Sequence, residues 1–142
     1  FCGAAAALQA EYTLPGVSQS LIITRMAGRT PVPEGENLAS LAKHQASMVL
    51  FLSSGLLEQV QAELLKGGYA PETPAAIVYK ASWPDEKVIR CTVGTLAQRG
   101  AEEKIRKTAL LLIGRFLDTA YERSKLYDPT FTTEFRKAEG TN

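Results

Sequence analysis

The sequence has few of the side chains that build disulfide scaffolds and metal centres. Its 142 residues contain two cysteines, Cys2 and Cys91, which lie far apart, and a single histidine, His44. Two cysteines are too few for a disulfide-rich scaffold, and a cysteine-based zinc site needs about four ligands. A lone histidine excludes a histidine-based catalytic constellation within this chain. We therefore expect no metal, and a reducing, cytoplasmic setting.

The sequence also lacks an excess of one charge and a long apolar run. Sixteen Lys and Arg residues face fifteen Asp and Glu residues, so the formal net charge is +1. A balance so close to zero does not favour binding to nucleic acid or to a membrane surface. No apolar run approaches the roughly 18 residues that a membrane span needs. With 45% hydrophobic and 22% charged residues, the composition is typical of one soluble globular domain.

Nucleotide-binding loops and activated nucleophiles are missing as well. The chain contains neither a Walker-type phosphate loop (GxxxxGK followed by Ser or Thr) nor a GxGxxG loop. Its serines in loops, Ser18, Ser53, Ser54 and Ser82, have no base to activate them. Cys91 falls in a predicted strand without a histidine partner, which favours packing over nucleophilic chemistry. We assign no catalytic residue.

Short apolar runs alternate with segments of helical spacing along the chain. We expect strands at 20–25, 47–52, 74–79, 86–91 and 108–113, and helices at 4–12, 37–45, 56–66 and 92–106. The first two strands are expected to be buried. The fourth, which alternates polar and apolar residues, is expected to be more exposed and able to run antiparallel to the third. The alternation predicts an α/β fold with a mixed sheet of about five strands flanked by helices.

Ligands in open α/β sheets favour the loops at the carboxyl ends of strands. Three loops follow predicted strands, at 52–55, 80–84 and 113–115, and spacing alone favours ordinary tight turns for them. Arg25 and Arg29 follow the first strand. They are either solvated surface charges or a pair that clamps carboxylates through bidentate hydrogen bonds.

Two other side chains have alternative interpretations. Trp83, in the loop at 80–84, is either an aromatic that contacts a ligand or a packed lid. His44 lies near the end of the helix predicted at 37–45, where a cation is favourable next to the helix dipole. We assign His44 no catalytic role.

Four strings of the sequence resemble one protein family. The run 14–25, ending in Ile-Ile-Thr-Arg, resembles the strand that opens the second domain of the tetrapyrrole methylases. The strings at 25–33 (Arg-Met-Ala-Gly-Arg-Thr-Pro-Val-Pro), 78–87 (Val-Tyr-Lys-Ala-Ser-Trp-Pro-Asp-Glu-Lys) and 124–131 resemble the branch of that family that methylates precorrin-4 or cobalt-precorrin-4 at C-11. The resemblance covers nearly the whole chain.

The resemblance implies a two-domain parent protein. The family's first domain carries a GxGxGxP-like loop and a Gly-Asp-Pro motif, neither of which occurs here. We therefore expect 1–142 to be the C-terminal domain without the N-terminal one, with 1–13 as the interdomain helix and 114–142 as a C-terminal extension. On this interpretation the chain alone is inactive.

The resemblance also implies particular binding residues. Arg25 and Arg29 would face the trough that holds the tetrapyrrole, whose acetate and propionate groups suit arginine. Small residues would let the backbone approach S-adenosylmethionine (SAM), and a leucine would form an apolar wall. The implied contacts of SAM, and of its product S-adenosylhomocysteine, are Leu52, Ala81, Ser82 and Ala109.

The implied reaction is methyl transfer by direct displacement from SAM to a ring carbon of the macrocycle, within cobalamin biosynthesis. Such a reaction needs no protein nucleophile, so positioning and exclusion of water would supply most of the rate. The family is generally homodimeric. One alternative is a stand-alone binding or dimerisation module. Another is a sister methylase that acts at another ring position, against which the Arg-Thr-Pro-Val-Pro and Ala-Ser-Trp-Pro-Asp strings argue.

Overall fold

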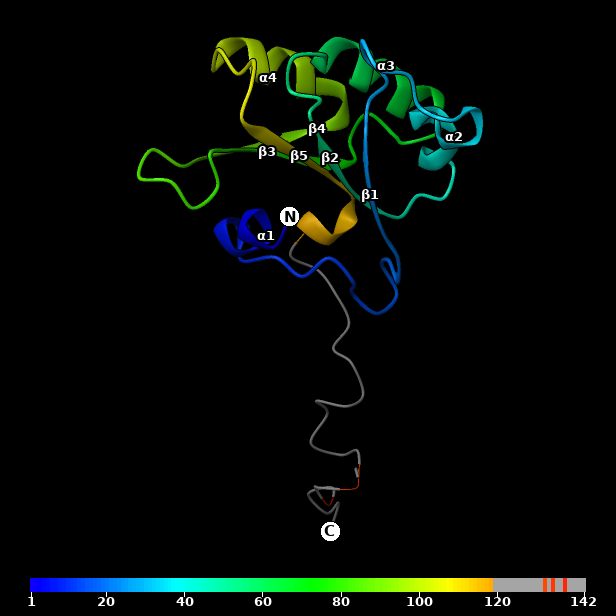
Figure 1. The fold of residues 1–142 in the computed structure, drawn as a ribbon. Helices are drawn as coiled ribbons and strands as arrows, with labels where there is room; N and C mark the ends of the chain where they lie inside the picture. The colour runs from blue at the N-terminus through cyan, green and yellow to red at the C-terminus, as the bar shows by residue number, and fades with distance from the viewer. Residues whose placement is uncertain (119–131, 133, 135–136, 138–142) are drawn as a thin grey trace.

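The chain folds into one mixed sheet with helices on both faces (Figure 1). The structure is a computed structural model that describes residues 1–118, 132, 134 and 137. Most of the predicted extension at 114–142, including the string at 124–131, lies outside the described residues. Its beginning is described and forms a short 3-10 helix, Arg115–Leu117, whose Phe116 and Leu117 are buried.

The sheet has five strands in the order β1-β2-β5-β3-β4. β1 and β2 are parallel, whereas β5 runs antiparallel to both of its neighbours, β2 and β3, and β4 runs antiparallel to β3. The last strand of the chain is therefore inserted between two earlier ones. The predicted α/β class with a mixed five-stranded sheet is confirmed. The strands are β1 (Leu21–Arg25), β2 (Ser47–Phe51), β3 (Pro74–Tyr79), β4 (Lys87–Thr92) and β5 (Ala109–Ile113).

The described residues form four α-helices. Three of them cover one face of the sheet, and α1 lies on the other face beside the 3-10 helix Arg115–Leu117 (Figure 1). α3 turns an apolar stripe of Leu57, Val60 and Leu64 towards the core, as its helical spacing predicts. α2 begins at Asn37, whose side chain accepts a hydrogen bond from the Ser40 N–H. The helices are α1 (Cys2–Leu8), α2 (Leu38–Ala42), α3 (Leu57–Lys66) and α4 (Leu96–Glu102).

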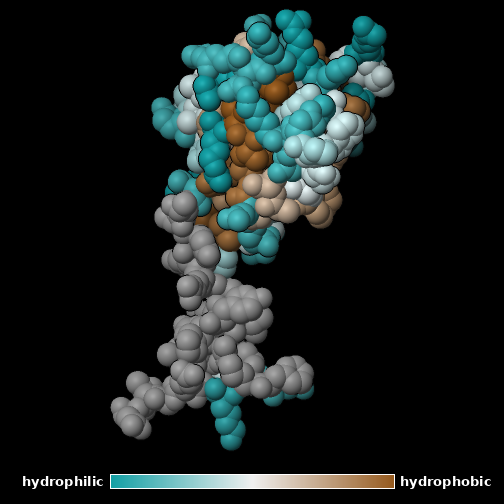
Figure 2. Space-filling view, turned by 90° about the vertical axis from the view of Figure 1, so that its left-hand side faces the viewer, coloured by the Kyte–Doolittle hydropathy of each residue, from teal (hydrophilic) through white to brown (hydrophobic). Residues whose placement is uncertain are grey.

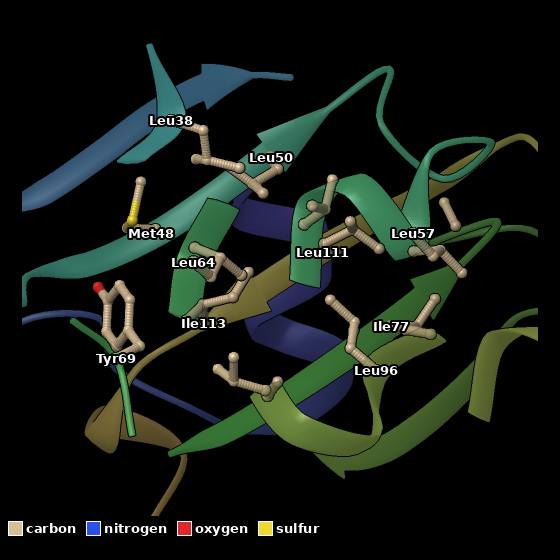
Figure 3. Packing of buried hydrophobic residues seen from close by; sticks show 14 of the residues in the cluster. Leu38, Met48, Leu50, Leu57, Leu64, Tyr69, Ile77, Leu96, Leu111 and Ile113 are labelled. Atoms are coloured by element: carbon tan, nitrogen blue, oxygen red, sulfur yellow. The ribbon is translucent and has the colours of Figure 1, made fainter. Parts of the chain in front are cut away.

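The central strands are buried on both faces. In β2, Met48 and Leu50 pack among α2, α3 and α4, whereas Val49 between them faces the α1 side. Leu111 and Leu112 of β5 divide in the same way, and all five side chains are fully buried. Figure 3 shows the cluster of buried apolar side chains on the face that α2, α3 and α4 cover. Burial on both faces explains why these strands are continuous apolar runs in the sequence.

The first strand differs from the prediction. β1 was expected to be a buried strand, but it is an edge strand of the sheet, paired only with β2. Its central residue Ile23 is 47% exposed. The same β-branched composition suits a half-covered edge and a buried strand, so composition alone does not separate the two positions.

Three helices end before the predicted residue: α1 at Leu8, α2 at Ala42 and α4 at Glu102. The cause is the same for α1 and α4, because the backbone enters the left-handed region at Gln9 (φ 52°) and at Lys104 (φ 55°). The N–H groups of Ala10 and Ile105, which follow these two residues, each donate a hydrogen bond to the carbonyl five residues earlier. Helices often end in this way, but usually at glycine, so the sequence carried no stop signal here. A 3-10 helix, Val93–Thr95, precedes α4, and Thr92 forms a capping box with Thr95 at its start. The predicted Thr92 cap therefore belongs to this 3-10 helix, and α4 begins after Thr95, which makes no side-chain cap hydrogen bond.

Candidate functional site

One cavity lies at the edge of the sheet where three strands meet. Because β5 is antiparallel to β2 and β3, its first residues reach the same edge as the last residues of those two strands. The cavity measures about 260 Å³, and we call it the β5-edge cavity. Its lining consists of Phe51, Leu52, Ser54, Val78, Lys80, Ala81, Trp83, Thr108, Ala109 and Leu110.

Three of the four predicted cofactor residues line this cavity together. Leu52 follows β2, Ala81 follows β3, and Ala109 begins β5. Ala109 is buried and Ala81 is half-buried, whereas the Leu52 side chain is 84% exposed. Ser82, the fourth, is exposed in the next turn position and does not line the cavity.

The backbone around the β5-edge cavity is held in an uncommon conformation. Leu52 (φ 51°), Lys80 (φ 48°), Ser82 (φ 69°) and Thr108 (φ 58°) all have left-handed backbone. Such angles are uncommon for residues other than glycine, and for a β-branched threonine they are an outlier. The Lys80 N–H donates to the Thr108 carbonyl at 2.9 Å, which joins two of these positions directly. Backbone strain of this kind gathers at binding sites, where the surrounding structure holds it in place.

A second cavity, of about 240 Å³, lies next to the first. Leu52 lines both cavities, so the two share one apolar side chain. We call the second one the arginine cavity, because it contains both arginines that the sequence singled out. It is lined by Arg25, Met26, Gly28, Arg29, Thr30, Leu52 and Leu56.

The two arginines of this cavity have different surroundings. The Arg25 guanidinium donates to the carbonyls of Thr30 at 3.0 Å and Pro31 at 2.8 Å, so it braces its own loop. Arg29 is exposed and has no hydrogen-bond or ion-pair partner within the described part of the chain. Arg29 is therefore the guanidinium that is free to meet an anion, and a substrate contact for Arg25 stays a prediction.

The loops after β1 and β2 are joined by one buried hydroxyl. Ser53 is fully buried, and its Oγ accepts from the Met26 N–H at 2.8 Å while donating to the Phe51 carbonyl at 2.7 Å. This bridge fixes the position of Leu52, which lies between Phe51 and Ser53 in the chain. Sequence reasoning treated Ser53 only as a serine without a base, because a bridge between distant segments leaves no local pattern.

A known family model matches most of the chain. The family model described as Tetrapyrrole (Corrin/Porphyrin) Methylases matches residues 1–97, more than half of the chain. The chain belongs to the tetrapyrrole methylase family. The predicted family is thus confirmed, and the matched residues include the arginine cavity, Leu52 and Ala81.

Relatives of this tetrapyrrole methylase chain carry a more specific name. A cobalt-precorrin-4 C(11)-methyltransferase of Methanocaldococcus jannaschii is 51% identical over 136 residues, and a precorrin-4 C(11)-methyltransferase of Pseudomonas aeruginosa is 40% identical over 136. Each alignment covers 95% of this chain but only 52% and 54% of the relative. The chain therefore spans about half the length of the curated relatives it matches.

Solved structures of the family have the same fold. The X-ray structure of a cobalt precorrin-4 methyltransferase, a cobalamin biosynthetic enzyme, superposes with a TM-score of 0.81 at 49% identity. The match covers 82% of this chain and 49% of that one. A uroporphyrin-III C-methyltransferase of Thermus thermophilus, complexed with S-adenosyl homocysteine, superposes with a TM-score of 0.67 over 82% of this chain and 51% of that one. At 20% identity, that second likeness shows the fold alone.

Three remaining features of the described residues concern metal ligands, the Cys91 thiol and helix length. No group of three or more Cys, His, Asp or Glu side chains among the described residues is arranged to hold a metal ion. Burial raises the pKa of the Cys91 thiol to about 11, so the thiol stays protonated at neutral pH. Over the same residues, no helix is long and apolar enough to cross a membrane.

The Ser53 bridge gives a first prediction. Ser53→Ala leaves the Met26 N–H without its acceptor, and an unsatisfied amide of this kind costs about 1–3 kcal/mol. We expect the free energy of unfolding to fall by that amount and the Met26 amide to exchange its hydrogen faster. Ser20→Ala, at an exposed serine, is the control and should change neither. Denaturant titration and hydrogen exchange measure both effects, and unchanged values for Ser53→Ala would show that the bridge is dispensable.

Proposed function

We propose that this chain forms one side of the cofactor and substrate sites in a SAM-dependent methyltransferase that methylates C-11 of precorrin-4 or cobalt-precorrin-4. The observation that carries the proposal is that Leu52, Ala81 and Ala109, from three separate segments, line a single cavity. That cavity adjoins a second one lined by Arg29, which has no partner among the residues that the structure describes. The names of the relatives support the substrate and its place in cobalamin biosynthesis.

The residues of the β5-edge cavity suit an adenosyl ligand. The two alanines leave the backbone open to close approach, and Leu52 offers an apolar surface. Pockets for small molecules measure about 300–1,000 Å³, so a cavity of about 260 Å³ supplies part of such a site. When bound, SAM supplies a methyl group already activated on its sulfonium. The residues of this chain then have to hold and orient the ligands, with no nucleophile of their own.

The arginine cavity suits an acidic macrocycle. A tetrapyrrole of this pathway bears several acetate and propionate groups, and Arg29 can hydrogen-bond a carboxylate with its planar fork. Arg25, by holding the carbonyls of Thr30 and Pro31, keeps the loop that carries Arg29 in shape. Leu52, shared by both cavities, would separate the two ligands from water at the point where they meet.

We further propose a cytoplasmic homodimer that has no nucleic-acid or membrane partner. The net charge of +1 supports the absence of polyanionic partners. The half-exposed edge strand β1, with Ile23 at its centre, supports association, because an edge strand leaves backbone groups unpaired. No observation favours a stand-alone module over the methyltransferase.

Ala81→Glu tests the cofactor site. In the protein at its full natural length, the added carboxylate would enter the β5-edge cavity without disturbing the core, because Ala81 is only half-buried. We expect calorimetry to show affinity for S-adenosylhomocysteine weakened by at least roughly a hundredfold, since an unpaired charge would face the ligand. Ala62→Glu, on the exposed surface of α3, is the matched control and should bind normally. Unchanged affinity for Ala81→Glu would remove this cavity from the cofactor site.

Arg29→Ala tests the substrate site separately. Loss of one charge-assisted hydrogen bond should weaken binding of the macrocycle about ten- to a hundredfold and leave the affinity for S-adenosylhomocysteine unchanged. Arg29→Lys should restore part of the loss, because an ammonium lacks the planar fork. Arg115→Ala removes another exposed arginine and serves as the control. Binding of the macrocycle by Arg29→Ala at wild-type affinity would mean that Arg29 is an ordinary surface charge.

A further inference from the structure

The turn between β3 and β4 places an exposed tryptophan at the β5-edge cavity. Trp83 is the only tryptophan among the 142 residues. Its side chain lines the cavity and is nevertheless 55% exposed, so it contributes little to the apolar core on either face of the sheet. The turn projects beyond the sheet (Figure 1), and Figure 2 views the molecule from that side, where apolar residues form a band bordered by hydrophilic ones.

Hydrogen bonds within the turn hold Trp83 in place. The Trp83 N–H donates to the Lys80 carbonyl at 2.9 Å, and the Trp83 carbonyl accepts from the Glu86 N–H at 3.0 Å. The Glu86 carboxylate in turn accepts from the Ser82 N–H at 2.6 Å. The backbone that carries the indole is therefore already ordered before a ligand binds, which lowers the entropy cost of binding at this turn.

Lys80 adds a second support for the indole. Its ammonium lies 5.3 Å from the centre of the Trp83 ring, within the range of a cation–π contact, and pairs with Asp85. The hydrogen bond between these two groups raises the pKa of Lys80 and lowers that of Asp85, so both stay charged at neutral pH. The Lys80 ammonium therefore stabilises the indole in its position at the cavity.

We propose that Trp83 stacks on the adenine ring of the adenosyl ligand in the β5-edge cavity. The inference rests on the proposed function and deepens it, because it assigns the adenine to one end of the cavity. A planar, uncharged ring matches the exposed π surface of an indole. Ala81, two residues before Trp83, lines the same cavity with no side chain beyond its Cβ, which leaves space beside the indole.

The charges of the turn argue against the macrocycle as the stacking partner. Two exposed carboxylates lie within three residues of Trp83. Asp85 is paired with Lys80, whereas the Glu86 carboxylate has no cation partner among the described residues and would repel a ligand that bears many carboxylates. Arg29, which has no partner among the described residues and suits such a ligand, lies in the neighbouring arginine cavity, which Trp83 does not line. The cation of the β5-edge cavity, Lys80, is instead paired with Asp85, so the two cavities differ in the cation that is available to a ligand.

Substitution of Trp83 in the protein at its full natural length tests the proposal. Base–aromatic stacking is worth enough that Trp83→Ala should weaken binding of S-adenosylhomocysteine roughly five- to a hundredfold. Methylthioadenosine, which keeps the adenine but lacks the amino-acid end, should lose the same factor. Trp83→Phe keeps a ring and should recover most of the affinity. Pro84→Ala changes the same turn but leaves the indole, so its affinity should match the wild type.

A fluorescence measurement makes the test independent of the alanine variant. The emission of Trp83, taken as the difference between the wild type and Trp83→Phe, should be quenched when methylthioadenosine is added and unchanged by homocysteine, which has no adenine. Wild-type affinity of Trp83→Ala for both adenosyl ligands, or no quenching, would overturn the proposal. A loss confined to macrocycle binding would also overturn it, because the indole would then face the substrate. If the wild type binds no S-adenosylhomocysteine, the proposed function fails together with this inference.

Discussion

The antiparallel insertion of β5 between β2 and β3 is the constraint on which the site depends. β2 and β3 end at one edge of the sheet, and only a strand of opposite direction begins at that edge. Ala109, at the start of β5, is paired with Tyr79 at the end of β3, and the Lys80 N–H extends this pairing to the Thr108 carbonyl. A parallel β5 would carry Ala109 to the opposite edge, and the cavity would lose one of its walls.

This arrangement has a conformational cost. The backbone leaves β2 and β3 and enters β5 through left-handed residues, Leu52, Lys80 and Thr108, and strained positions of this kind cost roughly 1–3 kcal/mol each. Burial of one large aliphatic side chain contributes about 1.5–3 kcal/mol. The fully buried residues of the central strands, such as Leu50 and Leu111, are therefore of a size to offset the strain. Leu52 itself is exposed, so its own side chain gains little from burial in the core.

Local features of the chain could be predicted from the sequence, because they depend on neighbouring residues. The apolar stripe of α3, the five strands and the Thr92 cap all follow from short-range patterns. The early ends of α1 and α4 could not be predicted, since Gln9 and Lys104 take the conformation that glycine normally signals. The edge position of β1 depends on which strands pair, which no local pattern encodes.

At the candidate site, too, some features could be predicted from the sequence and others depend on the folded structure. Leu52, Ala81 and Ala109 were identified through resemblance, and the strand order explains why they line one cavity. The separate surroundings of Arg25 and Arg29, and the Ser53 bridge, depend on contacts that only the folded chain makes. The spacing of residues alone favours ordinary turns for the loops after β2 and β3. In the structure, however, each of these loops contributes residues to the β5-edge cavity.

The central claim is that the ends of β2 and β3 and the start of β5 form one side of an adenosyl-binding site. A crystal structure of the protein at its full natural length with bound S-adenosylhomocysteine tests this claim most directly. The account predicts that the adenosyl group contacts Leu52, Ala81 and Ala109. An adenosyl group bound elsewhere, with none of these three residues within contact distance, would contradict it.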